Sequence, residues 1–265
     1  MAIVFEDLVI DRVLDGVFRD KNANVLGGLN QIQNFQITTS SDPKDKTDAR
    51  GILIKRFFTT KSVEMSAENA LFSLSLLGLQ TGNGKTIASA KNKIVLPMIK
   101  KYAKAAKITL PTGITPIEGT LSVTGLKSTG VPDPSLVYKS GVNEGAGTYV
   151  YNAGTHEITL PSDCADQVQV QFKYESENGV KVLQTADKFP KECELTLSVL
   201  VCDACDKEVL RQAYVVFPAF QMAPDFDITL DTESAHPFSG IAAVDYCATD
   251  KSLFYIAMSE DDIEE

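Results

Sequence analysis

Two short segments of the chain have the residue types and spacing of known binding chemistry. The first, Gly82-Asn83-Gly84-Lys85-Thr86, ends like a phosphate-binding loop, in which backbone N–H groups and a lysine hold phosphate oxygens. The first glycine of that motif would stand at position 79, which is Leu79, and the segment follows a predicted helix where the motif needs a strand. A flexible glycine-rich connection is therefore the better interpretation.

The second segment, Cys202-Asp203-Ala204-Cys205, has the spacing of a metal-binding cysteine pair. Cys193 and Cys247 could complete four thiolates around zinc. Structural zinc sites usually show a second close pair, which the sequence lacks, and five cysteines in a long chain without an export signal favour reduced thiols. Buried strand cysteines are the simpler interpretation, and metal binding at this pair stays open.

Residues for general acid–base or nucleophilic catalysis are scarce. The two histidines, His156 and His236, stand in strand and loop contexts and are predicted to be turn or surface residues. The sequence contains no GxSxG motif and no cysteine in a catalytic frame. It therefore predicts a protein that is not an enzyme and binds no cofactor.

Length and composition describe a chain able to bury one large core or two smaller ones, with 265 residues of which 44% are hydrophobic. No apolar run approaches the roughly 20 residues of a membrane span. Glu6, Asp7 and Asp11 stand where a secretory signal would need Lys or Arg. We therefore expect a protein made and kept in a cytosol, without a membrane span.

Charge is unevenly distributed along the chain. Residues 1–107 hold 16 Lys and Arg against 10 Asp and Glu, whereas residues 108–265 hold 9 against 25. In a monomer this difference can arise by chance, but in a polymer of identical subunits it would bring complementary surfaces together. The acidic end of the chain, residues 259–265, is typical of a solvated terminus, and in a polymer it could line a channel.

The elements that would position such surfaces are clearest between Gly51 and Gly82. Val63 and Met65 alternate with polar residues at the period of a strand. Ser66 is predicted to cap a helix that Gly78 and Gly82 end. The apolar face of that helix is predicted to consist of Ala67, Ala70, Leu71, Leu74 and Leu77.

Two charged segments are predicted to contact neighbouring subunits. Residues 40–50 form a polar stretch with no core-forming side chain, interpreted as a mobile hairpin tip that a neighbour would order. Residues 85–107 carry seven lysines around an edge strand interrupted by Pro97. The interface candidates are Asp42, Lys44, Lys46, Asp48, Arg50, Lys100, Lys101 and Lys104.

A small β domain is predicted to interrupt the chain at residues 115–178. Turn signals separate its short strands, and Val168, Val170 and Phe172 alternate with polar residues as in a half-buried antiparallel strand. The flanking parts, residues 1–114 and 179–265, would form the main core. The second of these is expected to contain strands at residues 191–202, 210–221, 225–233 and 240–258.

The stretch TTKSVEMSAENALFSL and the strands that follow the insertion resemble bacteriophage tail tube proteins. That resemblance implies a mainly β fold, a tail-tube-type β-sandwich with one flanking α-helix and an inserted small β domain. It also implies a structural subunit that forms stacked rings, with six subunits the expected number, around a hollow conduit for DNA ejection.

The resemblance further implies partners and a location. The partners would be further copies of the chain, sheath, baseplate and tape-measure proteins, and DNA that passes through an acidic lumen without specific binding. The protein would be assembled in the bacterial host cytoplasm and located in the virion tail. The alternatives are another virion β-sandwich protein, of the decoration or baseplate kind, or a carbohydrate-binding module.

Overall fold

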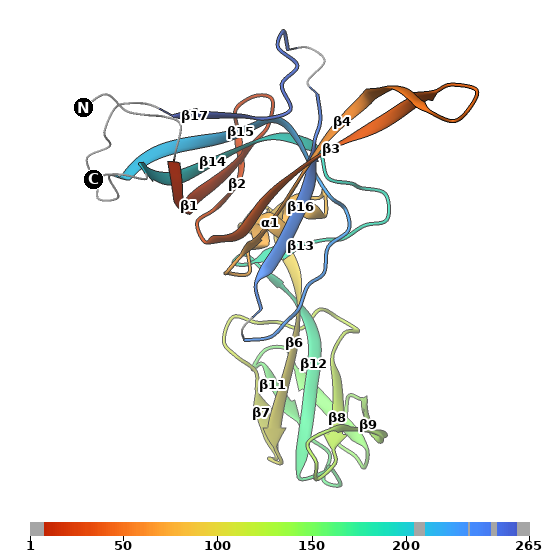
Figure 1. Ribbon diagram of the computed structural model, residues 1–265. Helices are drawn as coiled ribbons and strands as arrows, with labels where there is room; N and C mark the ends of the chain where they lie inside the picture. Colours follow the sequence, from red (N-terminus) through yellow and green to blue (C-terminus); the bar gives the residue numbers. More distant parts are fainter. Residues whose placement is uncertain (1–7, 204–209, 233, 245–247, 259–265) are drawn as a thin grey trace. The chain divides into compact units, whose positions relative to one another are not determined.

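The computed structural model describes residues 8–203, 210–232, 234–244 and 248–258. Cys205, Cys247 and the acidic segment 259–265 therefore lie outside the described residues. Strands make up 58% of the structure and helix 3%, which confirms the predicted mainly β class. Within the described ranges, no helix has the length and apolar character needed to cross a membrane. The chain divides into two compact units, residues 1–85 with 182–265, and residues 86–181 (Figure 1).

The first unit is built on one eight-stranded sheet with the order β2-β1-β14-β15-β16-β4-β3, in which β17 also pairs with β15. The bounds of its strands are β1 Leu8–Arg19, β2 Val25–Leu29, β3 Ile32–Thr47, β4 Leu53–Asn69, β14 Glu192–Asp203, β15 Leu210–Met222, β16 His236–Ala242 and β17 Tyr255–Met258. The strands predicted at 191–202 and 210–221 are thus confirmed as β14 and β15. The strand predicted at 225–233 is wrong over residues 225–232, which form no strand in the described structure, and Leu230 is 85% exposed; Glu233 lies outside the described residues.

Strand periodicity places one face of this sheet in the core. Leu195 and Leu197 on β14 are fully buried, as are Phe18 on β1 and Phe217 on β15. Each such side chain stabilises the fold by about 1.5–3 kcal/mol relative to an exposed position. The register Phe18↔Leu195 and Leu195↔Phe217 puts these residues side by side on one face.

The helix, α1 Leu74–Gln80, begins later than predicted. Ser66 is not its N-cap, because Ser66 lies within β4 and pairs with Ser239 of β16. The N-cap is Ser73, whose hydroxyl accepts a hydrogen bond from the backbone N–H of Leu76 at 3.2 Å. Leu76 is 1% exposed, whereas Leu74, predicted on the apolar face, is 42% exposed. The strand continues through Asn69 because its partner strands outweigh local helix propensity.

His236 ties α1 to the sheet and is buried, which contradicts its prediction as a turn or surface residue. The backbone N–H of Ser73 donates to its Nδ1 at 3.3 Å, and its Nε2 lies 2.8 Å from Oε1 of Gln80. A backbone N–H can only donate, so Nδ1 must be the acceptor and Nε2 carries the proton of a neutral ring. The ring stacks on Phe72 with centroids 5.0 Å apart.

We predict that this histidine makes the first unit less stable in mild acid. Burial lowers the pKa of His236 below its usual value of 6.5. The unfolded chain then binds the proton more readily, so stability is complete above about pH 6.5 and falls as pH decreases towards the lower pKa of the folded state. Denaturant unfolding between pH 5 and 7.5 measures this dependence. His236→Gln should flatten the slope and His156→Asn should preserve it, and equal slopes in wild type and His236→Gln would contradict the assignment.

The second unit is a seven-stranded sheet with the order β6-β12-β8-β9-β10-β11-β7. The bounds are β6 Ile94–Ala103, β7 Lys107–Thr109, β8 Ser122–Leu126, β9 Pro132–Ser140, β10 Thr148–Asn152, β11 Glu157–Thr159 and β12 Gln167–Ser176. Its own core contains Val168, Val170 and Phe172, as the alternation in β12 predicts, together with Val123 and Ile158.

The inserted unit begins at Thr86 and ends at Lys181, whereas the sequence indicates 115 and 178. The difference arises because most of the lysine-rich segment 85–107 belongs to the inserted unit and not to the first unit. β6 pairs along its whole length with β12, and β7 pairs with β11, so both strands belong to the inserted unit. β6 is an edge strand as predicted, although it continues through Pro97. Two short paired strands, β5 Lys85–Ile87 and β13 Val180–Val182, carry the chain across the boundary between the units.

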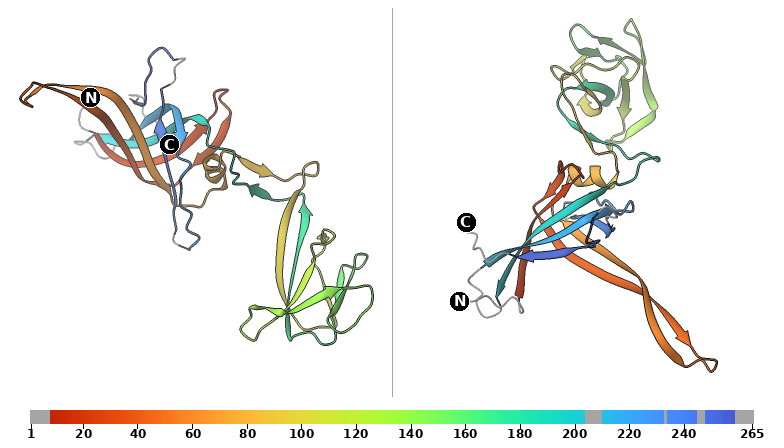
Figure 2. Two further views of the ribbon diagram at one scale, coloured as in Figure 1. Left: turned by 90° about the vertical axis from the view of Figure 1, so that its right-hand side faces the viewer. Right: turned by 90° about the horizontal axis from the view of Figure 1, so that it is seen from above.

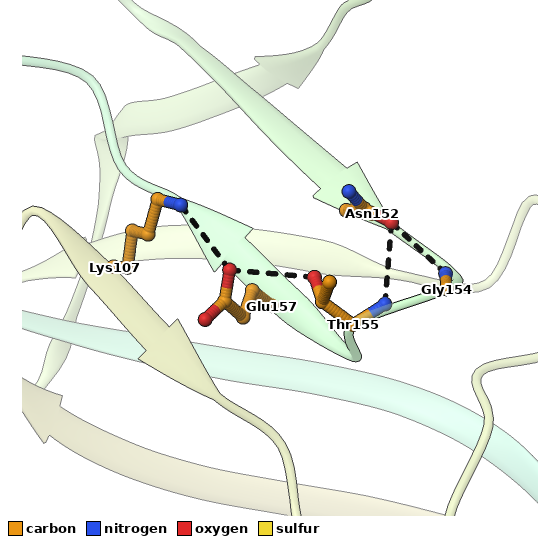
Figure 3. A network of polar contacts seen from close by, with 5 residues as sticks. All are labelled: Lys107, Asn152, Gly154, Thr155 and Glu157. Atoms are coloured by element: carbon orange, nitrogen blue, oxygen red, sulfur yellow. Dashed lines mark hydrogen bonds and ion pairs between the residues drawn. The ribbon is translucent and has the colours of Figure 1, made fainter.

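A polar network closes the β10–β11 turn of the second unit (Figure 3). The side-chain oxygen of Asn152 accepts from the backbone N–H groups of Gly154 at 2.9 Å and Thr155 at 3.3 Å. Glu157 accepts from the Thr155 hydroxyl and forms an ion pair with Lys107 of β7 at 3.2 Å. These contacts fix the turn and tie the short β7 to its neighbour.

Candidate assembly surface

The hairpin formed by β3 and β4 extends beyond the sheet of the first unit as a two-stranded arm (Figures 1 and 2). We define the arm as residues 42–60. β16 pairs with β4 only at residues 63–69, so no third strand of the described chain covers the arm. The strand from residue 53 to 60 spans about 25 Å at 3.3 Å per residue. Residues 40–47 thus belong to a paired strand and are not the loop predicted from their polarity.

Local contacts explain why this polar sequence forms strands. The carboxylate of Asp48 accepts from the backbone N–H groups of Arg50 at 2.9 Å and Ile52 at 2.8 Å, which closes the turn. Asp45 forms a two-pronged ion pair with Arg56 across the strands, at 2.7 and 2.9 Å. Hydrogen bonding from Arg56 lowers the pKa of Asp45.

The strand register divides the arm into two different faces. One face carries Asp45 and Arg56 with the apolar Ile54 and Phe58, which are 61% and 68% exposed. We call the opposite face the lysine face and define it as Lys44, Lys46, Leu53, Lys55 and Phe57. Asp45 lies on the other face, and Asp42, which precedes Lys44 in the alternation of β3, borders the lysine face at the base of the arm.

The positive charges of the lysine face repel one another in an isolated chain. Lys46 stands directly opposite Lys55, and like charges in that position destabilise a strand pair. None of its lysines forms an ion pair with another described residue, and the ammonium of Lys55 lies 4.9 Å from the ring centroid of Phe57. A bound anionic surface would relieve the repulsion.

The structure separates the interface candidates into two groups. Asp42, Lys44, Lys46, Asp48 and Arg50 gather on the arm, where the carboxylate of Asp42 accepts from the Thr60 hydroxyl at 2.5 Å. Sequence reasoning missed the apolar residues of the arm as surface, because a run such as ILIKRFF is typical of a core strand.

The other three candidates lie in the second unit and make contacts there. The ammonium of Lys101 donates to the carbonyl of Gly130 at 2.7 Å, and that of Lys104 to the carbonyl of Cys164 at 2.9 Å. Lys100 lies over the ring of Tyr102. Their role in stacking stays a prediction.

The glycine-rich segment and the described cysteines make contacts within the fold, whereas Cys205 of the cysteine pair lies outside the described residues. Asn83 donates to the carbonyl of Leu183 at 2.7 Å, and a Cβ on Gly82 would lie 2.2 Å from the carbonyl oxygen of Phe189. The glycine-rich segment is thus a tightly packed connection. Burial raises the pKa of the Cys193 thiol to about 12, which disfavours the thiolate that a metal needs. Among the residues with described positions, no group of three or more His, Cys, Asp or Glu could hold a metal.

Comparison with protein families gives a match to the YomU/Tube protein family over residues 9–252. The chain belongs to this family. The match confirms the resemblance to phage tail tube proteins and identifies the chain as a structural protein of a phage tube, a component of the virion tail. A search of curated proteins finds no match.

The matched range extends over most of both units. It contains the arm, α1, the inserted unit and the central strands β14 and β15. The arm is therefore part of the family region and not an appendage outside it.

Proposed function

We propose that the chain is a self-assembling subunit of a phage tail tube, and that the arm of one copy joins it to the next. The observation that carries this proposal is the exposure of large apolar side chains on both faces of the arm. Ile54, Phe57 and Phe58 are 61%, 44% and 68% exposed. A patch of this kind on a soluble subunit marks a surface that a partner covers.

The physical chemistry of an isolated hairpin supports the same conclusion. A two-stranded hairpin is at best marginally stable in water, and each strand of the arm has one edge that pairs with no described strand. Packing against a second copy would bury the apolar residues and pair the free edges. Stacked rings satisfy every copy in the same way, and six subunits per ring is the number that the resemblance implies.

The assembled tube would serve as a conduit for DNA during ejection. The chain has a net charge of −10, so a wall built from it repels duplex DNA, which carries one negative charge per about 1.7 Å of axis. Repulsion prevents tight binding and lets DNA slide. In this proposal the protein is not an enzyme, is assembled in the host cytoplasm, and meets sheath, baseplate and tape-measure proteins at its outer surface, ends and lumen.

Removal of the arm should abolish polymerisation and leave the subunit folded. Replacing residues 42–60 by Asn-Gly closes the pair Ser41↔Lys61 with a two-residue hairpin turn. Sedimentation and negative-stain electron microscopy should show rings or hollow filaments for wild type and monomers for the shortened chain. The melting temperature should stay close to that of wild type, because the excised residues are outside the core.

Point variants test whether assembly needs the apolar side chains of the arm when the arm keeps its full length. Ile54→Ser with Phe58→Ser should prevent assembly, whereas Val142→Ser removes a residue that is 91% exposed in the second unit and should have no effect. Normal tubes from the shortened chain would contradict the role of the arm. Monomeric wild-type protein that binds preformed capsids or baseplates would favour a decoration protein instead.

A further inference from the structure

We infer that the lysine face of the arm docks onto an acidic furrow of a second copy of the chain. This inference rests on the proposed assembly through the arm and names the surface that receives it. The furrow lies on the solvent side of β3, β4 and β16, next to the segment 223–227. It consists of two adjoining cavities of about 270 and 260 Å³ that share Ser66 and Ser239.

The lining of the furrow complements the lysine face. Its acidic residues are Glu64, Glu68, Asp225 and Asp227. Only Glu68 has a side-chain partner among the described residues, the amide of Asn34 at 2.9 Å. None of the four forms an ion pair with another residue that the structure describes.

Apolar groups stand between these carboxylates. Phe226 and Pro237 are half-buried, and Ile241 is 52% exposed. The lysine face has the matching composition, three ammonium groups around Phe57 and Leu53. Contact would bury apolar surface from both sides and pair the lysines with carboxylates.

The charge distribution favours a second copy as the occupant. Residues 42–60 carry five Lys and Arg against three Asp and Glu, whereas the remainder of the first unit carries 10 against 24. The arm is thus a basic segment on an acidic body, and the body of another copy attracts it.

The chain cannot satisfy this attraction within itself. The furrow and the arm occupy successive parts of β4, at residues 64–68 and 53–60. The hairpin of β3 and β4 extends away from the neighbouring strands of the sheet (Figure 2). A contact between two different surfaces of identical chains is heterologous, so it repeats from copy to copy. Such repetition generates the rings or helical arrays that a tube requires.

A charge-swap experiment tests the pairing. Lys44→Glu, Lys46→Glu and Lys55→Glu reverse the lysine face, and Glu64→Lys, Asp225→Lys and Asp227→Lys reverse the furrow at exposed positions. Each triple variant alone should lower the sedimentable fraction about tenfold or more, since facing like charges oppose docking. The variant that carries all six substitutions should recover assembly, and so should an equimolar mixture of the two triple variants. Lys91→Glu, Lys139→Glu and Lys173→Glu form the control set, which lies in the second unit and should assemble normally.

The outcomes distinguish this inference from the proposed function. If the furrow variant assembles normally while the chain without its arm does not, the arm acts elsewhere and the furrow is not its receptor. If the variant with all six substitutions stays monomeric but folded, the two surfaces do not pair. A lysine-face variant that assembles normally but loses binding to a labelled 30-bp DNA duplex would assign this face to nucleic acid and overturn the inference.

Discussion

Leu76→Asp should leave the first unit unfolded or aggregated when the protein is expressed. Leu76 is 1% exposed on α1 and belongs to the same core as Phe18 and Phe217. Burying an unpaired carboxylate is unfavourable by several kcal/mol, and the loss of leucine packing adds about 2–5 kcal/mol. Domains of this kind have a total stability of roughly 5–15 kcal/mol, so the combined effect is comparable to the whole.

The matched control is Leu74→Asp on the first turn of the same helix. Leu74 is 42% exposed, and a carboxylate near a helix N-terminus interacts favourably with the helix dipole. This variant should fold with a melting temperature close to that of wild type. Circular dichroism and the soluble fraction measure both variants, and a soluble Leu76→Asp with native melting behaviour would show that α1 does not pack on the sheet.

The central strands could be predicted because their burial pattern is regular. In β14 and β12 every second residue faces a core. This alternation can be recognised in the sequence even when the partner strands are unknown. The family resemblance rests on the segment around β4 and α1 and on the strands that follow the inserted unit, and the family match over residues 9–252 confirms it.

The start of α1 could not be predicted from the same rules. Ser66, Ala67 and Glu68 have the composition of a capped helix, yet Ser239 and Gln36 pair with Ser66 on both sides in the sheet. Those partners are 173 and 30 residues away in the sequence, so a local pattern does not reveal them. Tertiary pairing decided the conformation.

Sequence patterns also mislead in the arm, because its apolar residues lie on the surface of the chain. A single chain normally buries residues such as Ile54 and Phe58, yet they are 61% and 68% exposed. The opposite strand is polar, and its Asp45 is fixed by Arg56 rather than by a core. A sequence pattern reports which side chains avoid water and does not report which molecule covers them.

The inserted unit gives the last prediction, which compares two excisions. Removing residues 86–181 should leave the first unit folded, whereas removing residues 115–178 should not leave a stable protein. The shorter excision keeps β6 and β7 but takes away β12 and β11, the strands that pair with them. β6 would then expose Ile94, which is buried in the complete chain, together with an unpaired strand edge.

The longer excision follows the boundary between the units and separates no strand pair of the eight-stranded sheet. Neighbouring strands lie about 4.8 Å apart, so a short Gly-Ser linker can join Lys85 to Val182 at the paired strands β5 and β13. Thermal unfolding, solubility and electron microscopy should show that the chain without residues 86–181 is folded and still assembles through its arm. The chain without residues 115–178 should aggregate. A folded 115–178 excision would contradict the assignment of β6 and β7 to the inserted unit. A folded 86–181 excision that forms no tubes would show that the inserted unit takes part in assembly, because the arm and the furrow are both intact in that variant.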